Sequence, residues 1–154
     1  SILIPDGRLC SCGRHGCIEM YASARGICQT CLELLKEEKD YTGILAQYTK
    51  ETLTSKIIGE AANQGDPIAI KVFEKTGYWL GIAMANAATF SAPEAIFLMG
   101  GPTKAGDVLM KPLRESFEKH LLMIYKDKVK IMLSQLNGND AAILGAAALL
   151  QNKD

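Results

Sequence analysis

The start of the chain combines a polar, glycine-containing segment with a helical pattern of apolar positions. Residues 1–16 show no regular period and contain the turn sequence Pro5-Asp6-Gly7, so we expect a loop there. From Cys17 to about Lys39, apolar residues recur three or four positions apart, which predicts a helix although Gly26 weakens its middle. Residues 40–53 give no firm signal.

The middle of the chain predicts two further helices. The first is short and runs from Thr54 or Ser55 to Ala62. Asp66 and Pro67 then form a strong helix start, because the carboxylate caps the first turn and proline lacks only an N–H that would be unpaired there. This long helix ends at Pro93, and its nearly continuous apolar stretch at residues 80–90 indicates packing on several sides.

The last part of the chain alternates short apolar runs with helical spacing. Residues 95–99 and 129–133 are predicted as buried strands, and residues 108–125 between them as a helix. Gly138-Asn139-Asp140 is expected to cap a final helix over residues 141–150. The order of the elements predicts a layered α/β domain with too few strands for a complete sheet.

Composition limits the number of domains and the kinds of partner that we expect. With 154 residues, 48% of them hydrophobic, the chain can bury one core, so residues 1–154 are expected to form a single domain. The 17 basic and 17 acidic residues leave no net charge that would attract nucleic acid or a membrane surface. The most apolar stretch, Tyr78–Phe90, is too short to span a bilayer. The start of the chain lacks the pattern of a signal peptide. We therefore expect a protein without a membrane or nucleic-acid partner for this segment.

The clearest candidate chemistry is a cluster of thiols near the start of the chain, made up of Cys10, Cys12 and Cys17. Five cysteines in an otherwise ordinary composition indicate a reducing, cytoplasmic compartment, where closely spaced thiols are commonly metal ligands. Gly13 and Gly16 supply the turns that let one tight loop direct several thiolates at one zinc ion. A structural zinc takes four ligands, and His15 is awkwardly placed for ligation within the tight loop. The alternative is a set of reduced thiols without a metal.

Three other signals are weaker. Cys28 and Cys31 have the spacing of a redox pair but fall inside a predicted helix, so packing is the better interpretation. Glu19 lies in the first turn of a helix, where a carboxylate interacts favourably with the helix dipole or can bind a polar ligand. Gly100-Gly101 follows a predicted strand, where it can form an ordinary tight turn or let backbone N–H groups approach a nucleotide.

Together, these motifs resemble the ROK family of sugar kinases and related repressors. The segment from Leu9 to Ser23 resembles the family's C-x-C-G-x-x-G-C-x-E signature, including the Tyr-Ala-Ser that follows it. The resemblance covers nearly the whole chain. Further matches are Gly65-Asp66-Pro67, Leu80-Gly81-Ile82, Ser91 to Ile96, Leu98 to Gly101 and Asn139 to Ala147.

The resemblance implies an RNase-H-like fold of the actin/hexokinase ATPase type, built from two α/β domains with a cleft between them. It implies a structural zinc on Cys10, Cys12 and Cys17, completed by an upstream histidine, and sugar binding by Glu19. It places Gly100 and Gly101 beside ATP, which carries Mg²⁺ and donates its γ-phosphoryl group to a hydroxyl of a hexose. The chain is expected to self-associate as a homo-oligomer, because an open half-molecule exposes apolar faces.

The chain departs from the family pattern at its start, because the phosphate loop, catalytic aspartate and zinc-binding histidine of the family precede the cysteine cluster. We therefore expect residues 1–154 to form the C-terminal half of a sugar kinase that needs its missing N-terminal half. No catalytic residue is expected in this chain, which should be inactive alone because phosphoryl transfer lacks a base and a Mg²⁺-phosphate clamp. Glucokinase is the favoured parent. The alternatives are an N-acylhexosamine kinase, a ROK repressor with an upstream DNA-binding domain, or a zinc-stabilised module without catalysis.

Overall fold

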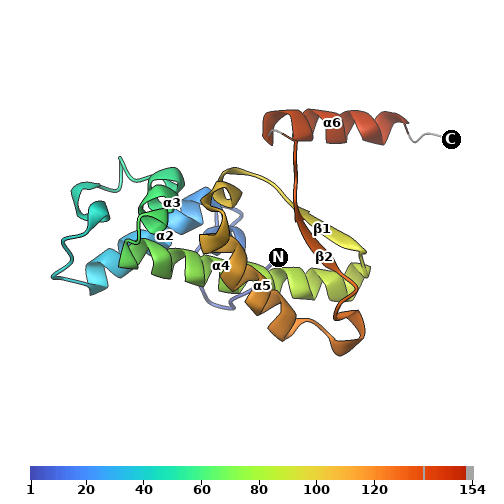
Figure 1. The fold of residues 1–154 in the computed structure, drawn as a ribbon, viewed down its shortest axis with the longest axis horizontal. Helices are drawn as coiled ribbons and strands as arrows, with labels where there is room; N and C mark the ends of the chain where they lie inside the picture. Colours follow the sequence, from blue (N-terminus) through green and yellow to red (C-terminus); the bar gives the residue numbers. More distant parts are fainter. Residues whose placement is uncertain (137, 152–154) are drawn as a thin grey trace.

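The structure is a computed structural model that describes residues 1–136 and 138–151 (Figure 1). Helices carry most of the fold, and the 3₁₀ helices are labelled η. In chain order, the elements are α1 (Glu19–Ala22), α2 (Ala24–Glu37), η1 (Ile44–Gln47), α3 (Ser55–Asn63), α4 (Pro67–Ser91), β1 (Ala95–Leu98), η2 (Gly101–Ala105), α5 (Asp107–His120), η3 (Met123–Tyr125), β2 (Lys130–Leu133) and α6 (Gly138–Gln151).

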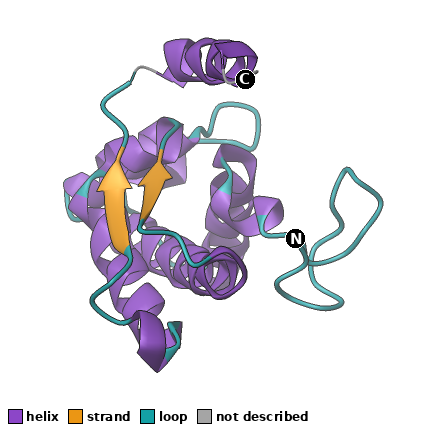
Figure 2. Cartoon of the chain, turned by 90° about the vertical axis from the view of Figure 1, so that its right-hand side faces the viewer, coloured by secondary structure: helices purple, strands orange, loops and turns teal. Residues whose placement is uncertain are grey.

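The two strands form a parallel pair, in which Ile96 lies opposite Ile131 (Figure 2). Parallel strands need a crossover, and α5 supplies it. Ile96, Leu98 and Ile131 pack into an apolar cluster with residues of α4 and α5, among them Met84 and Phe117. The predicted α/β layering is therefore confirmed, with helices covering one face of the strand pair.

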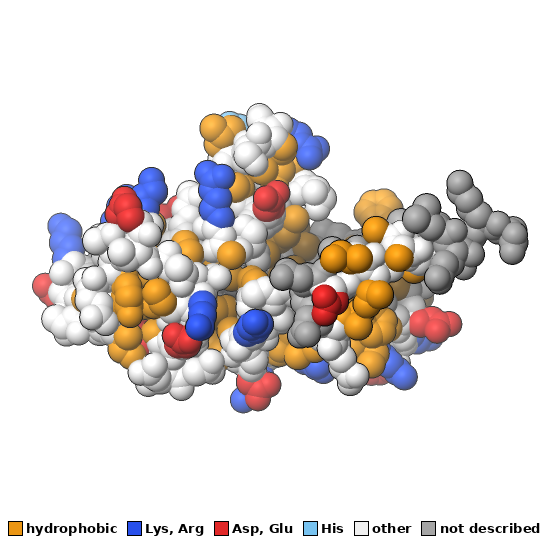
Figure 3. Space-filling model, turned by 90° about the horizontal axis from the view of Figure 1, so that it is seen from above, with side chains coloured by type: hydrophobic (Ala, Val, Ile, Leu, Met, Phe, Trp, Pro, Cys, Tyr) orange, Lys and Arg blue, Asp and Glu red, His pale blue; other side chains and the backbone are white. Residues whose placement is uncertain are grey.

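The other face of the strand pair is open and apolar. Phe97 is 63% exposed and Met132 is 44% exposed, because strand residues alternate between the two faces. Figure 3 shows hydrophobic side chains gathered at the end of the molecule that carries α6. A cavity of about 740 Å³ lies between these strands and α6, and Phe97, Met132 and Leu144 help to line it.

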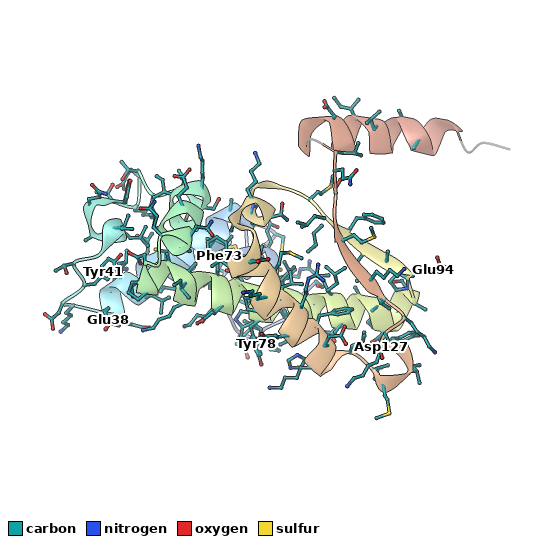
Figure 4. The ribbon with its side chains drawn as sticks, in the orientation of Figure 1. Glu38, Tyr41, Phe73, Tyr78, Glu94 and Asp127 are labelled. Carbon is teal, nitrogen blue, oxygen red and sulfur yellow. The ribbon has the colours of Figure 1, made fainter. Side chains whose placement is uncertain are left out.

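Helix α4 begins where the sequence predicts. The Asp66 carboxylate accepts hydrogen bonds from the backbone N–H groups of Ile68 and Ala69, each at 3.0 Å, and Pro67 occupies the first turn. The other oxygen of Asp66 accepts from the Tyr41 hydroxyl and from the backbone N–H of Ile44. Figure 4 shows Tyr41 at the end of the molecule opposite Glu94. Asp66 thus ties the segment before η1 to the start of α4.

Two predicted helices are wrong in their extent. The helix expected from Cys17 to Lys39 is divided at Ser23, whose extended backbone ends α1 and whose hydroxyl accepts from the Gly26 N–H at 3.1 Å to start α2. The helix expected over 108–125 ends at His120. There the chain becomes extended and Leu121 enters the core, only 5% exposed. In both cases a local cap or a tertiary contact overrides the helical spacing.

Two smaller expectations also need correction. The residues predicted to cap the last helix, Gly138-Asn139-Asp140, lie inside α6. The predicted packing of residues 80–90 on several sides holds only in part, because Phe90 is 92% exposed near the end of α4. That end of α4 is covered on the side of α5 and the strands and open on the other. Among the described residues, no helix combines the length and hydrophobicity needed to cross a lipid bilayer.

Candidate metal centre and neighbouring carboxylate

The three thiols predicted as metal ligands are brought together by the loop that precedes α1. The Sγ atoms of Cys10, Cys12 and Cys17 lie within 4.8 Å of one another, and those of Cys12 and Cys17 are 3.6 Å apart. Cys10 and Cys17 are buried, whereas Cys12 is exposed. The cluster therefore has a protected inner side and one solvent-facing thiol.

Glycine is required where this loop folds back on the N-terminal segment. Gly16 has a φ of +75°, and a Cβ there would lie 1.5 Å from the carbonyl oxygen of Ile4. The same close approach lets the Gly16 carbonyl accept from the N–H groups of Leu3 and Ile4, at 2.8 and 3.1 Å. Any side chain at Gly16 would separate the two segments, so this glycine sets the shape of the loop.

The cluster fits a zinc ion. Two thiolates that bind one tetrahedral zinc at about 2.3 Å lie about 3.8 Å from each other. The 3.6 Å between Cys12 and Cys17 is close to that spacing. Among the described residues, the group of ligand atoms consists of these three thiols and excludes His15. The His15 imidazole instead pairs its Nδ1 with the Gly7 carbonyl at 2.9 Å, in line with the expectation that it is poorly placed for ligation.

The exposed thiol of Cys12 and the buried thiol of Cys17 differ in the direction of their pKa shifts. The Arg14 guanidinium lies 3.5 Å from the Cys12 sulfur and lowers the pKa of Cys12 to about 6, because it stabilises the thiolate. Burial raises the pKa of Cys17, since an unliganded thiolate there would lack solvation. A bound cation would stabilise the thiolate form of this buried thiol.

Glu19 is the first residue of α1 and is exposed, two residues after Cys17. In the part of the chain that the structure describes, no donor hydrogen-bonds to its carboxylate, while its backbone carbonyl accepts from the Ser23 N–H at 3.2 Å. The carboxylate is thus available to a ligand, and α1 begins directly after the loop of residues 8–17 that carries the three candidate metal ligands, called the metal loop below.

Gly100 and Gly101 lie at the end of β1, as expected, and form the start of η2. Gly100 has a φ of +113° and its carbonyl accepts from the Thr103 hydroxyl at 2.7 Å. Gly101 helps to line a cavity of about 370 Å³ between η2 and α3, together with Ser55, Lys56 and Lys104. Glu19 is not among the residues that line this cavity.

The second pair of cysteines serves packing, as predicted. Cys31 is fully buried in the core and burial raises its pKa to about 12. Cys28 is half-buried, with its sulfur 3.6 Å from the Leu53 carbonyl, and burial raises its pKa as well. Neither thiol has the stabilised thiolate of a redox centre.

Two residues near the site were missed at the sequence level. Arg8 places its guanidinium over the Tyr21 ring at 4.6 Å and hydrogen-bonds to α1 and α2. Trp79 of α4 packs against a buried cluster that contains Cys10 and Cys17. No pattern signals these contacts, because their partners are far away in the sequence. The turn sequence Asp6-Gly7-Arg8 does not indicate which carbonyl groups the Arg8 side chain contacts.

Comparison with known proteins gives one consistent result. A sequence model of the ROK family matches residues 1–153. The glucokinase of Halalkalibacterium halodurans is 37% identical over 154 residues, which is 99% of this chain and 46% of that protein. The N-acetylglucosamine repressor of Escherichia coli O157:H7 is 32% identical over 147 residues, which is 96% of this chain and 34% of that protein.

A solved structure gives the same fold. It is the crystal structure of a ROK family glucokinase from Streptomyces griseus in complex with glucose and AMPPNP. The match has a TM-score of 0.83 and 31% identity, and covers 97% of this chain and 49% of that one. The fold is thus that of the RNase-H-like, actin/hexokinase-type ATPases, as predicted. The chain spans about half the length of the glucokinases that it matches.

Proposed function

The chain belongs to the ROK family, and we propose that it forms the C-terminal part of an ATP-dependent hexose kinase, with glucose as its sugar. The observation that carries the proposal is the exposed carboxylate of Glu19, which accepts no hydrogen bond from the described residues and follows the last thiol of the cluster by two positions. Carboxylates form strong hydrogen bonds with hydroxyl donors, and two oxygens can accept from neighbouring hydroxyls of one sugar ring. The glucose-bound relative supports this choice of ligand.

Cys10, Cys12 and Cys17 would hold a structural zinc. Such an ion supplies a cross-link between the N-terminal segment and the start of α1. The buried thiols support this role, because a zinc ion would stabilise the thiolate that burial disfavours at Cys17. A loop held by zinc would determine where α1 begins, and therefore where Glu19 lies.

The cavity at Gly101 is the proposed place for the nucleotide. Gly101 brings backbone without a Cβ atom to its edge, and Lys104 supplies positive charge. Lys56 also lines the cavity and lies 3.8 Å from the Glu60 carboxylate there. The relative with bound AMPPNP supports an ATP site in a protein of this fold. Mg²⁺ would accompany the nucleotide.

Phosphoryl transfer also needs a base for the sugar hydroxyl and groups that clamp the phosphates and Mg²⁺. We assign no catalytic residue in residues 1–154, and we propose that this chain alone does not turn over ATP. The test is a coupled assay with glucose and ATP. The 154-residue chain should give no glucose-dependent ADP, whereas the protein expressed as its gene encodes it should. Turnover of ATP by the 154-residue chain would disprove the proposal that this chain is inactive alone. No turnover by the gene-encoded protein would disprove the proposed kinase activity.

A repressor is the second candidate, because the N-acetylglucosamine repressor is also similar over most of the chain. A repressor would bind sugar without ATP turnover, and it would bind DNA through residues outside this segment. An N-acylhexosamine kinase would phosphorylate N-acetylated sugars in preference to glucose. Sugar-binding and turnover measurements with glucose and N-acetylglucosamine therefore separate all three functions.

The proposal includes a cytoplasmic, self-associating protein. Five free cysteines support a reducing compartment. Phe90 and Phe97, which are 92% and 63% exposed, support association through apolar surface. Light scattering should give a mass above that of one chain, and a monomer at all concentrations would contradict self-association.

A further inference from the structure

Arg8 joins the metal loop to the bend between α1 and α2. Its side chain is only 13% exposed. The guanidinium donates to the Met20 carbonyl at 2.6 Å, to the Gly26 carbonyl at 3.3 Å and to the Thr30 hydroxyl at 2.9 Å, and it pairs with the Glu33 carboxylate. One side chain of the loop thereby holds two successive helices.

The bend creates the need for this contact. Because Ser23 is extended, α1 ends after one turn, and the Met20 carbonyl has no backbone donor in the described part of the chain. The guanidinium of Arg8 fills that position. The Arg8 backbone N–H also donates to the Tyr21 hydroxyl at 2.9 Å, while the charged group lies over the Tyr21 ring at 4.6 Å.

These contacts bear directly on Glu19. A helix of four residues has too few internal hydrogen bonds to hold its own direction. The Cys17 carbonyl accepts from the Met20 N–H at 3.0 Å, and the Met20 carbonyl accepts from the Arg8 guanidinium, so the residue that follows Glu19 is held on both sides. We propose that Arg8 is a positioning residue, which holds the Glu19 carboxylate in the direction required to bind the sugar. This inference rests on the proposed sugar-binding role of Glu19.

The geometry requires an arginine. Its planar guanidinium presents five N–H donors and reaches several acceptors at once, whereas the lysine ammonium is a compact charge on a flexible stem. Glu33 accepts two hydrogen bonds from Arg8, one of them from Nε at 3.1 Å, but Glu33 is 46% exposed and lies on α2, so this ion pair is screened by solvent and does not reach α1. The Met20 carbonyl, rather than Glu33, is therefore the partner through which Arg8 positions α1.

The test uses the zinc-loaded protein, expressed as its gene encodes it, with glucose binding measured by calorimetry. Arg8→Lys should weaken glucose binding about tenfold, because a small displacement of a binding group is costly. Zinc content, affinity for an ATP analogue and the number of glucose sites per chain should stay unchanged. A merely structural role would lower the number of active sites and leave the glucose affinity of the remaining molecules intact.

Glu33→Gln is the matched control, since it removes the ion pair and leaves the carbonyl contacts of Arg8. It should change glucose affinity less than about twofold. If Arg8→Lys yields no folded protein, Thr30→Val is the substitute, because it removes one hydrogen-bond acceptor of Arg8 at similar side-chain volume. It should weaken glucose binding about threefold.

The outcomes separate this inference from the proposed function. No glucose binding by the wild type, or unchanged binding in Glu19→Gln, would overturn the sugar-binding role and the inference with it. Glucose binding that is weakened in Glu19→Gln but unchanged in Arg8→Lys would overturn the role of Arg8 alone. An effect of Glu33→Gln as large as that of Arg8→Lys would overturn the assignment to the backbone carbonyls.

Discussion

The rings of Tyr21 and Trp79 lie with their centroids 6.2 Å apart and their planes inclined by 51°. Trp79 is the one tryptophan of the chain and packs against the buried cluster that includes Cys10, Cys17 and Tyr21. The ring contact joins α1 to α4, the longest helix described, and the same indole packs against the buried thiols of the metal loop. The fluorescence of Trp79 should therefore respond to a change in the structure of the metal loop.

Removal of the metal should change the fluorescence of Trp79. Without the proposed zinc the loop would lose its cross-link, so the indole should become more exposed to water and its emission should shift to longer wavelength. The measurement is an emission spectrum before and after a zinc chelator, followed by addition of zinc. Trp79→Phe should abolish the signal. An unchanged wild-type spectrum, with zinc loss verified by metal analysis, would contradict the coupling between the loop and α4.

Cys17→Ser should weaken zinc binding at least about 100-fold, because a ligand and its negative charge are both removed. Competition with a chromophoric chelator measures the change. Cys28→Ser is the matched control, since Cys28 lies on α2 outside the thiol cluster, and it should leave zinc affinity within about twofold. Equal zinc affinity in wild type and Cys17→Ser would exclude the thiol cluster as the metal site.

Asp66→Ala should destabilise the fold by about 3 kcal/mol, more than loss of an ordinary helix cap. The carboxylate accepts from two N–H groups of α4, from the Ile44 N–H and from the Tyr41 hydroxyl, and all of these would lose their acceptor. Denaturant unfolding measures the loss. Tyr41→Phe, which removes one of these bonds, should cost about 1 kcal/mol. An equal cost for both variants would mean that the helix cap contributes little.

The sequence predicts the elements whose signals are local and misses those that depend on distant contacts. Asp66-Pro67 is found because a cap and a proline act within one turn. The thiol cluster and Glu19 are found because their spacing is carried by one loop. The break at Ser23 is missed because apolar spacing continues through it, and the contacts of Arg8 are missed because its acceptors lie 12 to 25 residues away.

Stability should fall at alkaline pH in a way that depends on Tyr41. Burial and the hydrogen bond to Asp66 raise the pKa of Tyr41 to about 12, above the value of about 10 in an unfolded chain. The stabilising contribution is therefore complete below pH 10 and is lost as the pH rises to about 12, because only the unfolded state releases the proton in that range.

Urea unfolding of wild type and Tyr41→Phe between pH 8 and 12 tests this dependence on alkaline pH. The difference in stability between the two proteins should shrink as the pH rises through this range. The comparison cancels the contribution of Cys31, whose raised pKa of about 12 acts in the same direction in both proteins. A constant difference in stability would mean that Tyr41 titrates alike in the folded and unfolded states.

Gly81 of α4 lies directly against α5, and its replacement by alanine should destabilise the protein by about 3 kcal/mol. A Cβ at Gly81 would lie 2.6 Å from the Ser116 Cβ and 2.7 Å from the Leu113 carbonyl oxygen, so the two helices would have to separate.

Gly59 of α3 is the matched control. A Cβ there would meet its nearest atom at 3.5 Å, an ordinary contact. Gly59→Ala should therefore stabilise the helix by about 0.5–1 kcal/mol. Denaturant unfolding measures both changes, and a Gly81→Ala protein as stable as the wild type would show that α4 and α5 do not cross at this residue.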